Sequence, residues 1–137
     1  MKVMLDPGAF VPFRAHETDA GLDIRAMDGG TVEPGEGRVF RTGVHVQLPE
    51  GTCGLLVSKS GLNVMHGITS TGLIDEGYTG EILVKLYNHS PLPYAVSAGD
   101  KISQLVILPV LRVPLVITEA LDEGTERGNQ GFGSSGK

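Results

Sequence analysis

The sequence is poor in cysteine, in aromatic residues and in uninterrupted apolar runs. It has no tryptophan, three tyrosines and four phenylalanines among 137 residues. The single cysteine, Cys53, excludes a disulfide within the chain, and its setting in CGLLV favours a small buried hydrophobe over a reactive thiol. This cysteine usage fits a reducing compartment.

No stretch is typical of a membrane span or a signal peptide. The most apolar run, LVILPVLRVPLVI at 105–117, is interrupted by Pro109, Arg112 and Pro114. The first residues, MKVMLDPGAF, lack an apolar run of signal-peptide length. We therefore expect a soluble, cytoplasmic protein with no membrane partner.

Positive charge is also scarce. The formal net charge is −5, and the 11 lysines and arginines are scattered along the chain. This distribution argues against duplex nucleic acid as the main partner. It leaves open a small anion held by a few well-placed donors.

Glycine and proline are abundant, with 20 and 8 residues. They separate short apolar runs, and VHVQL and EILVKLYN alternate with the period of a half-buried strand. The sequence predicts an all-β barrel or jelly-roll in one domain over 1–126. The expected strands are 1–5, 22–27, 30–34, 37–48, 53–58, 68–74, 81–88, 93–97 and 101–118.

Two segments depart from the strand pattern. KSGLNVMHG predicts a short helix over 60–66, with Ser60 as its N-cap and Gly67 as its C-terminal stop. The last residues, 127–137, are too poor in apolar residues to pack alone, which predicts either a frayed end or a flexible arm that orders over a ligand.

Two short stretches have residue types that suit phosphate or metal binding. Lys59, Ser60 and Gly61 precede or open the expected helix, where free N–H groups attract anions, although an ordinary capped helix has the same pattern. In AGLDIRA, Asp23 lies between Leu22 and Ile24 and is expected on the opposite face. It is either a ligand to the water shell of Mg²⁺ or a solvated strand aspartate.

The stretch GLIDEGYTGEI places a carboxylate and an aromatic ring in one glycine-rich turn. Asp75 at the end of an apolar strand is either a base that holds and polarises water or a turn-forming aspartate. Tyr78 either packs on a sugar or is a half-buried hairpin aromatic. Gln104, in GDKISQL, either orients a water or phosphate or satisfies a neighbouring backbone group.

In order along the chain, AGLDIRA, SKSGL, GLIDEGYTGEI, GDKISQL and RGNQGFGSSG resemble the five motifs of the homotrimeric deoxyuridine triphosphatases (dUTPases). The resemblance extends from about residue 10 to the C-terminus. It implies a β-clip, jelly-roll-like barrel that forms a homotrimer with shared active sites. It also implies Mg²⁺-dependent hydrolysis of dUTP to dUMP and pyrophosphate, which lowers dUTP and supplies dUMP for dTTP synthesis.

The resemblance also assigns roles to individual residues. Asp23 holds Mg²⁺ through water, Asp75 activates the attacking water, and Gln104 lies near the phosphates. The residues implied to bind substrate are Lys59, Ser60 and Gly61 at the phosphates, Thr69, Gly72 and Ile74 around the uracil, Tyr78 under the deoxyribose, and Arg127, Phe132, Gly133, Ser134 and Ser135 in an arm that closes the site.

The sequence departs from the family pattern at several positions. Lys59 stands where arginine is usual, which loses a bidentate fork, and Gln130 stands where glycine is usual. The stretch from Ser60 to Asp75 is short, and Thr69 or Ser70 lies near where an asparagine is often found. Uracil recognition is therefore expected to rest on backbone groups of 69–74 and on Tyr78.

Two other functions have similar sequence features. A dCTP deaminase shares the fold, but its catalytic glutamate falls where this chain has Lys85, which cannot act as a base while it is charged. An inactive trimeric binding module would be free to lose Asp75 or Arg127, and neither is lost. The four histidines lack metal-ligand spacing and are expected to be structural or exposed.

Overall fold

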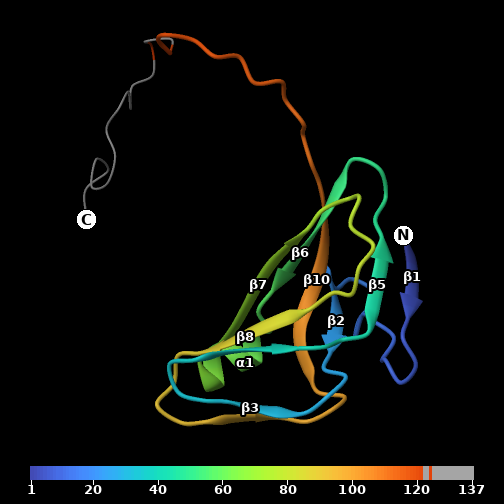
Figure 1. Ribbon diagram of the computed structural model, residues 1–137, viewed down its shortest axis with the longest axis vertical. Coiled ribbons are helices and arrows are strands. Elements are labelled where there is room, and N and C mark those ends of the chain that lie inside the picture. Colours follow the sequence, from blue (N-terminus) through green and yellow to red (C-terminus); the bar gives the residue numbers. More distant parts are fainter. Residues whose placement is uncertain (122–123, 125–137) are drawn as a thin grey trace.

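The computed structural model describes residues 1–121 and 124 and confirms an all-β chain with one short helix in this part (Figure 1). Its elements are β1 (Lys2–Leu5), β2 (Gly21–Arg25), β3 (Gly30–Val32), β4 (Gly37–Phe40), β5 (Val44–Gln47), β6 (Thr52–Val57), α1 (Ser60–His66), β7 (Ile68–Ile74), β8 (Val84–Asn88), β9 (Tyr94–Val96) and β10 (Lys101–Pro109). No helix in the described residues is long enough to cross a membrane.

The strands form one curled six-stranded sheet and two strand pairs. The large sheet has the order β2-β10-β6-β7-β8-β4, and the pairs are β1-β5 and β3-β9. Every pairing is antiparallel. Strand β10 lies between β2 and β6, so three segments that are distant in the sequence are hydrogen-bonded side by side.

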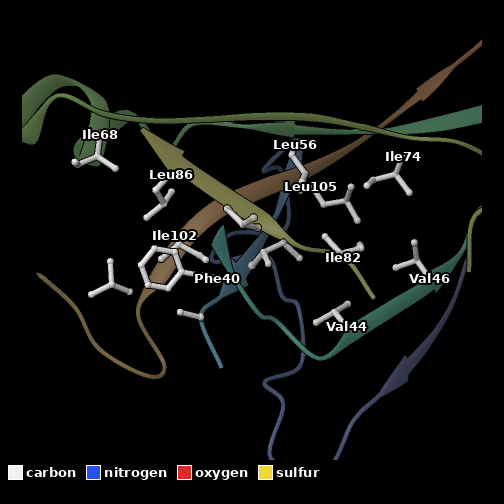
Figure 2. Close-up of a cluster of buried hydrophobic side chains, with 14 of the residues drawn as sticks. Phe40, Val44, Val46, Leu56, Ile68, Ile74, Ile82, Leu86, Ile102 and Leu105 are labelled. Carbon is white, nitrogen blue, oxygen red and sulfur yellow. The ribbon is translucent and has the colours of Figure 1, made fainter. Parts of the chain in front are cut away.

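The core lies between the curled sheet and the strand pairs, and its members follow the two-residue alternation of the sequence. Along β8 and the residue pair before it, Ile82, Val84 and Leu86 are buried, while Leu83 and Lys85 are exposed. Figure 2 shows these inward side chains meeting others from β4, β5, β6, β7 and β10. The predicted alternation in these segments is confirmed.

Several predicted boundaries were wrong. The strands expected over 22–27, 30–34 and 81–88 are shorter, at Gly21–Arg25, Gly30–Val32 and Val84–Asn88. The strand expected over 37–48 is two strands, because the chain turns at Gly43, where φ is +63°. The strand expected over 101–118 ends at Pro109, since proline lacks the N–H that a ladder needs. Ser60 is the first helical residue, and Lys59 is the N-cap without a side-chain capping bond.

The chain leaves the body of the molecule after β10 and extends away from it (Figure 1). Along 110–121 it contains no helix or strand. Several of its apolar side chains are almost fully exposed, among them Leu115, Val116 and Ile117. The predicted arm over 127–137 lies outside the described residues.

Two glycines with positive φ allow a matched test of the Gly43 turn. A Cβ on Gly43 would lie 2.6 Å from the Ala9 Cβ, whereas a Cβ on Gly51, where φ is +73°, meets nothing within 4 Å. We expect Gly51→Ala to lower the free energy of unfolding by about 1 kcal/mol through backbone strain. Gly43→Ala should cost about 1–3 kcal/mol more through overpacking. Equal losses in denaturant titrations would contradict this difference.

Candidate functional site

The first cluster surrounds Asp75, which follows β7 directly. Ile74 ends the strand with its side chain in the core, so the next residue enters an open turn with an exposed carboxylate. The turn is closed by the Tyr78 N–H, which donates to the Asp75 carbonyl at 3.0 Å. A pocket of about 240 Å³ lies here, lined by Leu73, Ile74, Asp75, Tyr78, Glu81 and Leu83.

Tyr78 stands at the edge of this pocket with 45% of its surface exposed. Its hydroxyl donates to the Glu81 carbonyl at 2.9 Å, which fixes the far end of the ring. A Cβ on Gly80 would lie 2.5 Å from that hydroxyl, so this position requires glycine. Gly77 faces open space, which leaves the turn accessible to a ligand.

Two glutamates that sequence reasoning missed connect this turn to other parts of the chain. Glu76 accepts hydrogen bonds from Arg112 and, at 2.9 Å, from the Gly51 N–H, and both bonds lower its pKa. Glu81 accepts from the backbone of Thr42 and Gly43 and from Arg41. Glu76 directly follows Asp75 and Glu81 lies three residues after Tyr78, but the partners of both glutamates are distant in the sequence.

The second cluster is centred on Asp23, which is buried with 5% of its surface exposed. One carboxylate oxygen accepts from Lys59 Nζ at 2.5 Å and the other from Lys101 Nζ at 2.9 Å. Burial raises the pKa of Asp23, but the two ammonium groups outweigh it and lower the pKa below 3.8. The solvated alternative was therefore wrong, and Lys101 is a site residue that sequence reasoning missed.

Gln104 belongs to this second cluster. On β10 it lies opposite Asp23 of β2 and opposite Val57 of β6, two residues before Lys59. Ser60 and Gly61 are exposed in the first turn of α1, and a Cβ on Gly61 would meet nothing within 4 Å. Four of the predicted phosphate-side positions therefore lie around Asp23.

The residues that are predicted to contact uracil are spread along β7. Ile74 lines the Asp75 pocket, and Gly72 lies opposite Leu56 in the sheet. Thr69 pairs with Tyr87 of β8, and its hydroxyl lies 2.8 Å from His89 Nε2. Thr69 is therefore at the α1 end of the strand, away from Asp75.

The two clusters lie at opposite ends of β7. Thr71 of β7 is level with Val57 of β6, so Lys59, two residues on in extended backbone, is level with Thr69. Asp75 is six residues further along, a separation of about 20 Å. In Figure 1, α1 is at the lower end of β7, and the loop that follows β7 begins at its upper end.

The remaining predicted positions are Lys85, the histidines and the residues of the C-terminal arm. The ammonium group of Lys85 lies 4.9 Å from the centre of the Tyr87 ring, on the outward face of β8. The part of the chain that the structure describes contains no group of three or more histidine, cysteine, aspartate or glutamate residues that would hold a metal. Arg127, Phe132, Gly133, Ser134 and Ser135 lie outside the described residues.

Comparison with known proteins points to one family. A model of the dUTPase family matches residues 9–136. A deoxyuridine 5'-triphosphate nucleotidohydrolase from Leifsonia xyli is 43% identical over 130 residues, which covers 92% of this chain and 85% of that protein. One from Clostridium kluyveri is 44% identical over 132 residues, with 93% and 91% covered.

Solved structures agree with the sequence comparison. The dUTPase of Staphylococcus bacteriophage 80alpha with dUPNHPP has a TM-score of 0.92 and 33% identity, and the alignment covers 99% of this chain and 98% of that one. A mutant dUTPase from phage phi11 of S. aureus, with a structural Mg(II) ion, has a TM-score of 0.80 and 33% identity. That alignment covers 87% of this chain and 96% of that one.

The Asp23 cluster predicts a specific pH dependence of stability. Because the folded-state pKa of Asp23 lies below the ordinary value of an aspartate, the stabilisation is complete above that ordinary value and is lost as pH falls through the folded-state pKa. Asp23→Asn should lower the free energy of unfolding at pH 7 by about 1–3 kcal/mol and flatten its fall in acid. Denaturant titrations across the acid range measure both effects.

Asp28→Asn is the matched control, since Asp28 is an exposed aspartate in the turn after β2. It should behave as the unmodified chain does. An Asp23→Asn variant with an unchanged acid profile would contradict the assigned pairing.

Proposed function

The chain belongs to the dUTPase family, and we propose a division of the hydrolysis between its two clusters. It is a nucleotide pyrophosphohydrolase that converts dUTP to dUMP and pyrophosphate. In our proposal the Asp75 cluster supplies the water-activating base and the contacts to sugar and uracil. The Asp23 cluster binds the phosphates.

The observation that supports this proposal is that the Asp75 carboxylate is exposed and unpaired in the described part of the chain. It is exposed at a pocket, and within residues 1–121 and 124 no donor pairs with it. A carboxylate that is free of other partners can accept a hydrogen bond from a water and take its proton as the water attacks phosphorus. The buried, doubly paired Asp23 has no such freedom, so the base is assigned to Asp75.

The pocket beside Asp75 suits a deoxyribose. Tyr78 presents its ring there, and the bond from its hydroxyl to the Glu81 carbonyl keeps the ring from turning away. A ring packed under C2′ leaves no room for a 2′-hydroxyl, which gives selectivity for deoxyribonucleotides. We assign uracil to backbone groups of 69–74, with Gly72 and Ile74 nearest to the pocket and Thr69 furthest along the strand.

The phosphates are assigned to Lys59, Ser60, Gly61 and Gln104. Around Asp23, two ammonium groups face one carboxylate, which leaves a local excess of positive charge in a chain of net charge −5. Lys59 is half-buried beside the exposed start of α1. A triphosphate there gains charge-assisted hydrogen bonds and free backbone N–H groups.

Mg²⁺ fits this cluster as an ion that arrives with the triphosphate. Mg²⁺ usually keeps several waters and binds through one or two carboxylates plus substrate phosphates. Asp23 offers one carboxylate, whose oxygens keep lone pairs beyond the two lysine bonds and can accept from metal-bound water. Bound Mg²⁺ would neutralise charge on the phosphates.

We propose a homotrimer whose active sites are shared between chains. Within one chain about 20 Å separates Lys59 from Asp75, too far for both to reach one reacting phosphate. Pairing the Asp75 end of one chain with the Asp23 end of another removes this difficulty. The exposed apolar segment after β10 supports contact between chains, since such surface in a single chain marks an interaction site.

The arm over 127–137 completes the proposed site. Arg127, Ser134 and Ser135 would bind the terminal phosphate, and Phe132 with Gly133 would cover the base. Base–aromatic stacking is worth about 1–3 kcal/mol, so this closure would add affinity as it excludes water.

Pyrophosphate release from dUTP, dCTP, dTTP and UTP, each with Mg²⁺ and with EDTA, tests this proposal. We expect Mg²⁺-dependent release from dUTP alone. Asp75→Asn should keep the fold and the trimer but lose about two to four orders of magnitude in kcat, the usual contribution of a general base.

Glu36→Asn, in an exposed turn, is the control for a lost carboxylate and should leave kcat unchanged. Normal turnover in Asp75→Asn would remove Asp75 as the base. Equal release from dUTP and UTP would instead remove the assigned role of Tyr78.

A further inference from the structure

Glu81 is a charged residue in an unusually well-satisfied setting. Its side chain is 20% exposed, and Oε1 accepts from the Gly43 N–H at 2.9 Å and from the Thr42 N–H at 3.2 Å. Arg41 Nε lies 3.2 Å from both carboxylate oxygens. Such a partly buried carboxylate with several donors holds its position, unlike an exposed ion pair.

The backbone at Glu81 is held by the same turn. Ile82 donates its N–H to the Val44 carbonyl at 2.8 Å, and its carbonyl accepts from the Thr42 hydroxyl at 2.6 Å. His45 Nδ1 lies 3.1 Å from the Thr79 carbonyl on the other side. The segment 79–82 is therefore fixed to the turn between β4 and β5 and to the first residues of β5.

The Glu81 carbonyl is in turn the acceptor for the Tyr78 hydroxyl. The backbone N–H of Tyr78 also donates a hydrogen bond, to the Asp75 carbonyl. The ring is thus held at its backbone end by the loop itself and at its hydroxyl end by the Glu81 carbonyl. The peptide of that carbonyl is bonded to Val44 through the Ile82 N–H, and the Glu81 carboxylate adds bonds to the adjacent Thr42–Gly43 turn. Glu81 acts on the pocket through Tyr78, since its carboxylate is bonded to the β4–β5 turn.

We propose that Glu81 is a positioning residue that sets discrimination between dUTP and UTP. Its carboxylate fastens the segment 79–82 to the Thr42–Gly43 turn, so that the Tyr78 ring stands at a fixed height under C2′ of the sugar. This inference rests on the proposed role of Tyr78. A displacement of about 1 Å is enough to change such selection strongly.

The test compares kcat/KM for dUTP and UTP in Glu81→Gln. This variant keeps the side-chain shape and one acceptor oxygen but loses the charge that pairs with Arg41. We expect the dUTP/UTP ratio to fall about tenfold, chiefly because UTP is accepted better. Glu50→Gln, the same change at an exposed residue before β6, should leave the ratio unchanged.

A double variant separates positioning from general loss of stability. In Tyr78→Phe the hydroxyl bond to Glu81 is already absent, so adding Glu81→Gln should change the ratio much less than it does alone. Thermal melting and trimer mass confirm that each variant is folded. A folded Glu81→Gln chain with an unchanged ratio, or strictly additive effects, would overturn the inference.

Arg41→Gln is the second variant if Glu81→Gln does not fold. It removes the guanidinium but leaves both backbone bonds to Glu81 in place. A smaller fall in the ratio is expected, and an unchanged ratio would overturn the inference. A parent enzyme that hydrolyses dUTP and UTP equally would refute the proposed role of Tyr78 instead.

Discussion

The pairing of β6 with β7 is the constraint on which the rest of the site depends. Its register places Val57 opposite Thr71 and Gly54 opposite Ile74. The chain enters β7 from the helix that follows Lys59 and leaves it at Asp75. A cationic cluster and a carboxylate without a donor in the described residues therefore lie at the two ends of one strand, and in the proposed function neither end is a complete hydrolytic site.

The two ends differ in their electrostatics, which suits the different roles that we propose for them. At one end, Lys59 and Lys101 neutralise the buried Asp23 and leave positive charge for an anionic substrate. At the other end, glutamates are paired with arginines and backbone N–H groups, and the Asp75 carboxylate is the one that we propose to activate water. An acidic chain can thus bind a triphosphate without a large basic surface.

Local patterns predicted the fold and the positions from which both clusters are built, and long-range contacts account for what they missed. Nearby residues determine the strand alternation and the glycine that ends α1. They also determine the position of Asp75 directly after an apolar strand. The lysine partners of Asp23 and the turn that holds Glu81 come from distant segments, so spacing along the chain gave no sign of them. Ser60 looked like an N-cap, but Lys59 takes that place while its ammonium group is drawn to Asp23.

Activity of mixed trimers tests most directly the claim that each site takes its two ends from different chains. Asp75→Asn and Lys59→Ala chains should each be inactive alone, and random mixing should restore about one quarter of the parent rate, because one ordered interface in each mixed trimer has both residues intact. No recovery in trimers shown to contain both chains would contradict the shared site and place both ends of the reaction within one chain.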